Sequence, residues 1–429
     1  MIITPSDMIP TPWGGPGGRA VAFRCVDGGQ LHSALDLDGR WPVVPGTVLA
    51  VTDLGAVSVD DIGRPEDRVR IIVRELGRPI QPMASGSDQE PKWEAKGYVR
   101  GDSGRWEETP VSIVSIRESL FARTRGLFET DVLAGSTVFI PGVGSVGSYV
   151  SLELAKAGVT SQIVMDDDRI EVPNAIRHIA KVSDTGRFKV NVMAEAIRGK
   201  NPYASVETCN AKVAWATQDM VRSFVRKSDL VICGADGPEG RVILNKICVE
   251  EGKPIIFAGA FRRAYGGQVL FVHPRETPCY QCFLRHLPRQ AKDQEVSSEE
   301  DAALLAYSDR PVPIEPGLSN DIAPISQMVV KLAIQHLLKG HATTLRSLDE
   351  DLKASWYMWI NRRERDTDYE KLEPLEFNVD GFHILRWYGI DFARDPECPC
   401  CGSFVRSTAA IRGIRRSPED AAKDASQEG

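Results

Sequence analysis

The stretch that decides the fold reads Val138-Phe-Ile-Pro-Gly142-Val-Gly144-Ser-Val-Gly147-Ser148. An apolar run typical of a buried strand leads into a Gly-x-Gly-x-x-Gly turn, and the residues that follow have the apolar spacing of a helix. In such a unit the backbone N–H groups and the positive end of the helix dipole meet at the turn, where they can bind a phosphate. A tight turn that needs small residues only for packing is the alternative, so this motif alone is weak evidence.

The chain around this turn alternates short apolar runs with helical segments. The runs lie at residues 137–141, 161–165, 229–233 and 254–257, and a segment such as Ser148–Ala157 shows the helical spacing between them. Short buried strands separated by helices predict a mostly parallel sheet with flanking helices, which is the Rossmann-like α/β class.

The composition narrows the kind of protein. Of 429 residues, 42% are hydrophobic and 26% charged, which is ordinary for a folded protein, and the net charge is −7. No long basic run could neutralise a phosphate backbone, so nucleic acid is not the expected partner. No run approaches the roughly 18 apolar residues of a membrane span, and the N-terminus lacks a basic and apolar leader pattern, so we expect a cytoplasmic protein that does not cross a membrane.

The pattern changes along the chain. Residues 1–115 are rich in Gly and Pro and carry short Val and Ile runs, which predicts a small β-rich accessory domain. Residues 116–405 carry the α/β pattern, and residues 406–429 have the polar composition of a disordered tail. We therefore predict two folded domains and a C-terminal tail.

Three later segments complete the secondary-structure prediction. Ala323–Leu338 spaces its apolar residues as a helix does. Trp356–Ile360 and Phe382–Tyr388 have the composition of strands. The predicted sheet therefore extends well beyond the glycine-rich turn in sequence.

Two Cys-x-x-Cys pairs predict a metal site. Cys279 and Cys282 form one pair, and Cys398 and Cys401 form the other, more than a hundred residues further on. The chain has nine cysteines, an odd number, and in a reducing compartment such pairs favour metal over disulfide. Each pair supplies half of a tetrahedral thiolate shell for Zn²⁺, and four thiolates leave no open position, so we expect structural zinc. Two unrelated thiol pairs are the alternative.

The second predicted strand ends in carboxylates. Met165 is followed by Asp166, Asp167 and Asp168, about twenty residues after the glycine turn. A carboxylate at this position of a Rossmann-like unit can accept a hydrogen bond from a ribose hydroxyl, so Asp166 and Asp168 are candidate nucleotide-binding residues. Up to this point the pattern allows both NAD and ATP.

The next segment distinguishes between an ATP site and an NAD site. It contains Asn174, Arg177, a Gly186-x-x-Lys189-Val motif and an Asn201-Pro pair. In the order and approximate spacing of these residues the chain resembles the ThiF/MoeB/HesA family of ATP-dependent adenylating enzymes. A hydride-transfer enzyme does not need an Asn, an Arg and a Lys aimed at phosphates, whereas attack on the α-phosphorus of ATP builds negative charge that fixed cations stabilise.

The resemblance implies a role for each matching residue around ATP and Mg²⁺, in addition to the phosphate-binding turn at Gly142, Gly144 and Gly147. The residues are Asp166 for the ribose, Asn174, Arg177 and Lys189 for the triphosphate, and Asp236, at the end of a later strand, for Mg²⁺. In many relatives an Arg just upstream of the first strand reaches the ATP site of the partner subunit. Arg123 or Arg125 occupies that place here, so the resemblance also implies a homodimer.

The implied activity is the adenylation of a C-terminal carboxylate with release of pyrophosphate. The substrate class is a ubiquitin-like or sulfur-carrier protein, or a peptide, and a conjugating partner is a further candidate. Relatives that form a thioester place a cysteine in the segment that corresponds to Arg310–Pro324, and this segment contains none. Ser319 is a substitute acceptor only if a base lies beside it. We therefore expect the chain to stop at the acyl-adenylate.

Two other kinds of protein stay open on the sequence alone. An NAD-dependent oxidoreductase shares the glycine turn and the strand-end carboxylate. A non-catalytic scaffold could keep the same fold as a binding module. Lys189 and Asp236 weigh against the oxidoreductase, and the set Arg177, Lys189 and Asp236 weighs against the scaffold.

Overall fold

The computed structural model of the chain describes residues 2–5, 19–24, 31–33, 43–50, 54–55, 58–62, 65, 67–75, 93–114, 120–124, 127, 130–235, 237–287, 317–341, 347–365, 367, 369–372 and 382–403. It divides into two compact units, Met1–Arg123 and Thr124–Gly429. The predicted bounds at residues 1–115 and 116–405 remain predictions. The predicted tail at residues 406–429 lies outside the described residues.

The N-terminal unit is built on a mixed eight-stranded sheet with strand order β7-β6-β5-β4-β2-β3-β1-β8. Its strands are β1 (Ile2–Pro5), β2 (Arg19–Arg24), β3 (Leu31–Ser33), β4 (Val43–Ala50), β5 (Val69–Glu75), β6 (Trp93–Arg100), β7 (Trp106–Thr109) and β8 (Val111–Val114), with the short helix η2 at Val59–Asp61. Ile71 and Ile72 of β5 point to opposite faces, and both are buried. Leu54 and Ile62 pack on Ile72. The Val/Ile run thus forms a strand that is covered on both sides.

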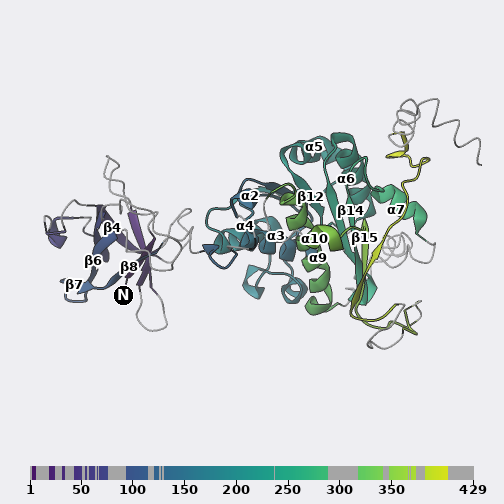
Figure 1. Cartoon of the computed structure of the whole chain (residues 1–429). Coiled ribbons are helices and arrows are strands. Elements are labelled where there is room, and N and C mark those ends of the chain that lie inside the picture. The colour runs from purple at the N-terminus through teal and green to yellow at the C-terminus, as the bar shows by residue number, and fades with distance from the viewer. Residues whose placement is uncertain are drawn as a thin grey trace, which may run out of the picture. The chain divides into compact units, whose positions relative to one another are not determined.

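The larger unit contains a second eight-stranded sheet, with strand order β11-β10-β9-β12-β13-β14-β15-β16 (Figure 1). The first five in this order are parallel, and β14, β15 and β16 continue the sheet antiparallel. The strands are β9 (Thr137–Pro141), β10 (Ser161–Met165), β11 (Ser205–Cys209), β12 (Leu230–Cys233), β13 (Ile255–Ala260), β14 (Gly266–Val272), β15 (Trp356–Ile360) and β16 (Arg386–Ile390).

Helices cover both faces of this sheet because its central strands are apolar on both sides. On β9, Ile140 belongs to a buried cluster that includes Leu154. The preceding residue, Phe139, points to the other face and belongs to a second cluster that includes Phe224. The helices that contribute to the first cluster are α3 (Ser145–Ala157), α4 (Lys189–Lys200) and α9 (Ser319–Leu337). The helices that contribute to the second cluster are α5 (Gln218–Lys227), α6 (Pro238–Glu251) and α7 (Tyr280–His286). Figure 1 shows these two groups of helices on either side of the sheet.

The remaining helical elements are short. They are α2 (Thr130–Ala134), η3 (Val172–Ile176), η4 (Val182–Asp184), η5 (Trp215–Thr217), η6 (Arg262–Ala264) and α10 (Ser347–Asp351). Within the described ranges, no helix is both long and apolar enough to cross a membrane. The predicted fold class, a Rossmann-like α/β sheet with flanking helices beside a small β-rich N-terminal sheet, is confirmed.

The order of the parallel strands fixes where a ligand can bind. Strand β9 lies between β10 and β12. After β9 the chain adds β10 and β11 along one edge of β9, and it then crosses over to add β12 and β13 along the other edge. At such a switch point the loops after the two central strands separate and leave a crevice at their carboxyl ends. The Gly142–Gly147 loop follows β9, and Gly234 and Ala235 follow β12, so both loops lie at this edge.

Candidate functional site

The glycine loop is packed backbone against backbone on the end of β12. Gly142 has φ +85°, in the left-handed region, and a Cβ atom on it would lie 2.3 Å from the Ala235 nitrogen. A Cβ atom on Gly147 would lie 2.0 Å from the carbonyl oxygen of Gly142. A Cβ atom on Gly144, in contrast, would meet nothing within 4 Å. Two of the three glycines are therefore needed for packing, and the third leaves open space in front of α3.

The peptide of Val143, in the middle of this loop, is held by two side chains. Its N–H donates to Oδ2 of Asp166 at 2.9 Å, and its carbonyl oxygen lies 2.7 Å from Nε2 of His178. Oδ1 of Asp166 also accepts the N–H of Asp168. Burial raises the pKa of Asp166, while the Lys189 charge and the two N–H donors act in the opposite direction. The loop, the end of β10 and the segment around His178 thus form one unit.

The Lys189 ammonium group forms ion pairs with the carboxylates of Asp166 and Asp168. Its Nζ lies 2.7 Å from Oδ2 of Asp168 and 3.9 Å from Oδ1 of Asp166. Lys189 is the first residue of α4, where the helix dipole disfavours a cation. The two carboxylates offset this, and they place the ammonium group at the edge of the sheet that carries the glycine loop.

The segment between β10 and α4 carries Asn174 and Arg177. Oδ1 of Asn174 accepts the N–H of Glu171 at 3.0 Å, which fixes the start of η3. Arg177 directly follows η3 and is half-buried. A Cβ atom on Gly317 would lie 3.9 Å from Nη1 of Arg177, so this guanidinium reaches the residues that lead into α9. Asn174 and Arg177 lie on the same short segment as His178, and the His178 side chain contacts the glycine loop.

The predicted Mg²⁺ ligand and the predicted upstream arginine are not placed in this site. Asp236 lies outside the described residues, although its neighbour Ala235 is described, and its role as a Mg²⁺ ligand stays a prediction. Arg123 lies in an exposed turn at the end of the N-terminal unit, and Arg125 lies outside the described residues. The predicted role of an arginine in a partner's site also stays a prediction.

Two buried side chains near the site have roles that the sequence did not disclose. His178 contacts the glycine loop, and the only sequence signal is its position directly after Arg177. Arg241, which is 3% exposed, donates from Nε to the Ala235 carbonyl at 3.0 Å and from Nη2 to the Ala258 carbonyl at 2.8 Å. Arg241 thus connects the end of β12 to β13.

Cys279, Cys282, Cys398 and Cys401 form one buried cluster, and their sulfur atoms all lie within 4.8 Å of one another. The Sγ atoms of Cys279 and Cys398 are 3.6 Å apart, and those of Cys282 and Cys401 are 3.4 Å apart. A disulfide needs about 2.05 Å, whereas a tetrahedral zinc shell with Zn–S bonds of about 2.3 Å has sulfur separations of about 3.8 Å. The cluster is therefore compatible with zinc.

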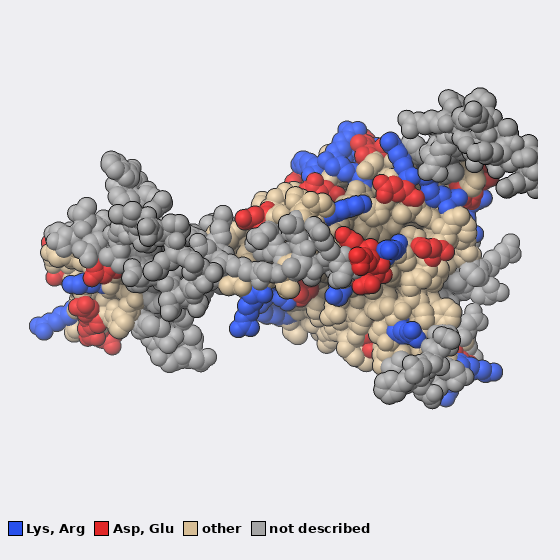
Figure 2. All heavy atoms as spheres, viewed as in Figure 1, with Lys and Arg blue, Asp and Glu red and all other residues tan. Residues whose placement is uncertain are grey.

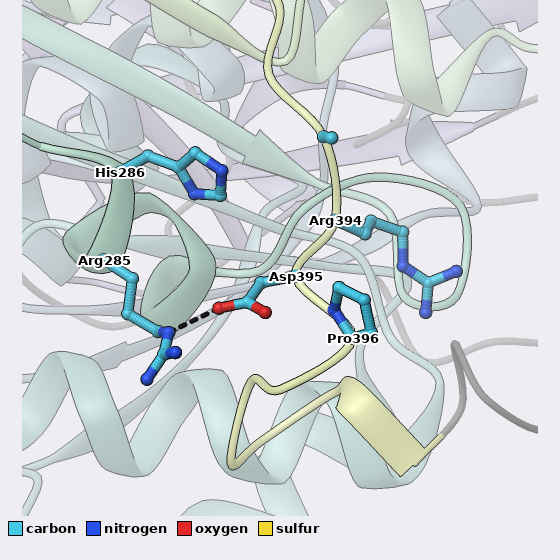
Figure 3. Close-up of a pocket in the computed structure, with 6 residues that line it drawn as sticks. Arg285, His286, Arg394, Asp395 and Pro396 are labelled. Carbon is cyan, nitrogen blue, oxygen red and sulfur yellow. Dashed lines mark hydrogen bonds and ion pairs between the residues drawn. The ribbon is translucent and has the colours of Figure 1, made fainter.

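Other bonds anchor the segments that carry the two cysteine pairs. Arg285 of α7 and Asp395 of the C-terminal segment form an ion pair, and Figure 3 shows the two side chains pointing toward each other. Nδ1 of His286 donates to the Cys282 carbonyl at 2.8 Å. Sγ of Cys400 lies outside the group of four and accepts from Nδ2 of Asn245 at 3.2 Å. The segments on both sides of the cluster are thus anchored by protein groups as well.

The sheet order and the glycine loop define a Rossmann-like fold, and comparisons with known proteins specify the family. The model of the ThiF family matches residues 118–361, more than half of the chain. The SAMP-activating enzyme E1 of Haloferax volcanii is 32% identical over 157 residues, 36% of this chain and 56% of that protein. The ubiquitin-like modifier-activating enzyme 5 of Branchiostoma floridae is 26% identical over 227 residues, 49% of this chain and 55% of that protein.

Two further similarities concern an adenylyltransferase and a solved structure. The adenylyltransferase and sulfurtransferase UBA4 of Lodderomyces elongisporus is 28% identical over 203 residues, 46% of this chain and 43% of that protein. The crystal structure of E. coli MccB with MccA-N7isoASN aligns with a TM-score of 0.46 and 20% identity, over 64% of this chain and 68% of that chain.

The chain belongs to the ThiF family, as the sequence motifs predicted. It spans about half the length of the curated relatives that it matches.

The close approach at Gly147 can be tested with Gly147→Ala. Because the new Cβ atom meets a backbone oxygen, we expect a loss of about 1–3 kcal/mol in the free energy of unfolding, measured by urea denaturation. Gly144→Ala is the matched control, since its Cβ atom has space, and it should unfold within about 1 kcal/mol of the wild type. Equal stability of the two variants would contradict the packing described for the loop.

The cysteine cluster can be tested with Cys282→Ser. We expect this variant to lose the bound metal, measured by inductively coupled plasma mass spectrometry, and to melt at a lower temperature, because metal binding is coupled to folding. Cys400→Ser should keep the metal, since Cys400 lies outside the group of four. Retention of a full equivalent of zinc by Cys282→Ser would show that the ligand set is different.

Proposed function

We propose that the protein uses ATP and Mg²⁺ to adenylate the C-terminal carboxylate of a small protein or peptide, with release of pyrophosphate. The observation that carries this proposal is the convergence of the glycine loop, the Asp166–Lys189 pair and the Arg177 segment at the switch point of the sheet. A mononucleotide with a triphosphate suits this arrangement, because the first turn of α3 faces open space at Gly144 and cations lie beside it.

Each residue of the site has a part in the proposed reaction. Asp166 would bind the ribose, and the N–H groups of the loop and of α3 would bind phosphate oxygens. Lys189 would exchange its contact with the exposed carboxylate of Asp168 for one with the triphosphate. Asn174 and Arg177 would approach the same phosphates from the segment that His178 anchors.

The chemical step needs no proton transfer. A carboxylate oxygen of the substrate attacks the α-phosphorus, and the bond from that phosphorus to the bridging oxygen of the β-phosphate breaks. Pyrophosphate leaves with the electron pair, and the substrate keeps AMP as a mixed anhydride. Arg177 and Lys189 would stabilise the charge that builds up on the phosphates. Asp236 would hold Mg²⁺, which neutralises phosphate charge when it is bound.

The similarity to named relatives supports the substrate class. Relatives that match the chain are named as a SAMP-activating enzyme, a ubiquitin-like modifier-activating enzyme and an adenylyltransferase and sulfurtransferase. We therefore propose a ubiquitin-like or sulfur-carrier protein, or a peptide, as the substrate, and zinc as a structural ion in the cysteine cluster. A conjugating partner and a cytoplasmic location belong to the same proposal.

The handover of the acyl group is proposed to involve an external nucleophile. The segment Arg310–Pro324 contains no cysteine that could form a thioester. Oγ of Ser319 lies 3.0 Å from the hydroxyl of Tyr149, and a hydroxyl neighbour is a poor general base. The acyl-adenylate would therefore react directly with a thiol, an amine or a persulfide.

The face of the larger unit seen in Figure 2 supports a protein rather than a nucleic acid as the partner there. On the face seen in Figure 2, basic and acidic side chains of the described residues alternate in small groups. A surface for a polyanion needs a continuous basic patch. The charges on this face suit recognition of a folded protein better.

A homodimer is proposed through the segment between β10 and α4. Val172, Ile176 and Val182 are 59%, 76% and 65% exposed, although their side chains are large and apolar. Apolar residues gathered on one exposed segment mark an interaction surface. The same segment carries Arg177, so a second copy seated there would also enclose the proposed ATP site.

Exchange of pyrophosphate into ATP tests the proposed reaction. With a candidate substrate that ends in glycine, Arg177→Ala and Lys189→Ala should each reduce the exchange rate at least about a hundredfold, because each removes a cation that stabilises the transition state. Lys156→Ala is the control, since Lys156 forms an exposed pair with Glu153 on α3. Unchanged exchange in either site variant would remove that residue from the mechanism.

Light scattering coupled to size exclusion tests the proposed dimer. Ile176→Asp places a charge at the centre of the apolar segment, so we expect it to elute as a monomer where the wild type elutes as a dimer. Trp215→Asp changes an exposed apolar residue on η5 and should leave the dimer intact. A wild type that is monomeric at every concentration would contradict the proposal.

A further inference from the structure

His178 directly follows the Asn174–Arg177 segment and contacts the glycine loop. Its Nε2 lies 2.7 Å from the Val143 carbonyl oxygen, which can only accept, so Nε2 carries the hydrogen. Its Nδ1 accepts the N–H of Ala180 at 2.9 Å, so Nδ1 carries none. The residue is 5% exposed. Both ring nitrogens are thus used, and the contacts require one neutral tautomer.

The other side of the same loop residue is also fixed. The N–H of Val143 donates to Oδ2 of Asp166, which comes from the end of β10. Rotation of either peptide plane next to Val143 would break one of these hydrogen bonds, and a buried polar group without a partner costs about 1–3 kcal/mol. The loop between Gly142 and Gly144 is therefore held in one conformation by two side chains from different segments.

We propose that His178 is a positioning residue for nucleotide binding. Its neutral imidazole holds the glycine loop in the conformation that receives the triphosphate, and it sets how far Arg177 lies from that loop. The inference rests on the proposed function in that the ligand is ATP. His178 itself does not touch the nucleotide, and it acts through the backbone of Val143 and through its neighbour Arg177.

Burial is the main reason why the His178 ring stays neutral near neutral pH. Lys189 of α4 and Asp184 of η4 face it, and Asp166 shares the Val143 peptide. Burial lowers the pKa of His178 from its ordinary value of 6.5, and Lys189 lowers it further, while the Val143 hydrogen bond and Asp184 act in the opposite direction. Protonation would place a hydrogen on Nδ1, opposite the N–H of Ala180, so acid breaks this contact.

Isothermal titration of the full chain with ATP tests the proposal. His178→Ala removes the donor to Val143, so the dissociation constant should rise about tenfold or more, as expected for a lost buried hydrogen bond. His178→Gln keeps a donor at the position of Nε2 and should bind within about threefold of the wild type. His336→Ala is the matched control: this ring packs on Phe271 at the far end of α9, so its loss should lower stability but not affinity.

Two further measurements separate positioning from a general structural role. Between about pH 8 and pH 5 the affinity of the wild type should fall more than that of His178→Gln, with the difference appearing only below 6.5. Asp166 contacts the same peptide in the wild type and in His178→Gln. Its titration therefore changes the affinity of both equally and does not contribute to the difference between them. Nitrogen NMR of ¹⁵N-labelled histidine should show the neutral tautomer with the hydrogen on Nε2, both with and without ATP.

The outcomes decide between clear alternatives. Wild-type affinity in His178→Ala, or a hydrogen on Nδ1 in the NMR spectrum, would overturn the role of His178. If His178→Ala does not fold, the comparison of the wild type with His178→Gln across pH and the tautomer measurement decide instead. A wild-type chain without affinity for ATP would overturn the proposed function, and the tautomer measurement would still decide whether His178 holds the loop as described.

Discussion

A Cβ atom on Gly147 would lie 2.0 Å from the carbonyl oxygen of Gly142, and one on Gly234 would lie 2.4 Å from the same oxygen. The ends of β9 and β12 and the first turn of α3 therefore touch through their backbones, which only glycine allows. The rest of the candidate site is built on this contact. It fixes where α3 begins, and Asp166 and His178 then hold Val143 beside it.

The position of the Lys189 charge opposes the dipole of helix α4. Lys189 stands at the start of α4, where the dipole of a helix disfavours a cation by about 0.3–1 kcal/mol. Asp166 and Asp168 provide the opposite charge, and the burial of Asp166 opposes its own ionisation. Groups whose charge is opposed by their surroundings are typical of functional sites.

The cysteine cluster supports the other half of the sheet. Cys279 and Cys398 are 119 residues apart, and the cost of closing a loop grows only slowly with its length, so this distance does not oppose the cluster. The four thiols belong to the same buried cluster as Leu270 and Val272 of the antiparallel strand β14. A metal bound there would join the start of α7 to the C-terminal segment, and it would stabilise the antiparallel strands without taking part in the proposed chemistry at the parallel ones.

The sequence determined the elements whose signal is local. Neighbouring residues are enough to predict β9 from the run Thr137–Pro141 and the loop from the glycine spacing. Each Cys-x-x-Cys pair is also a local signal, whereas the meeting of the two pairs in one cluster depends on the fold. Tertiary structure decided what depends on distant segments. The tautomer of His178 is set by Val143, 35 residues away, and the sequence alone does not indicate which carbonyl a buried arginine such as Arg241 will meet. Hydrogen bonds between segments depend on how the sheet is assembled, and no local pattern of residues encodes them.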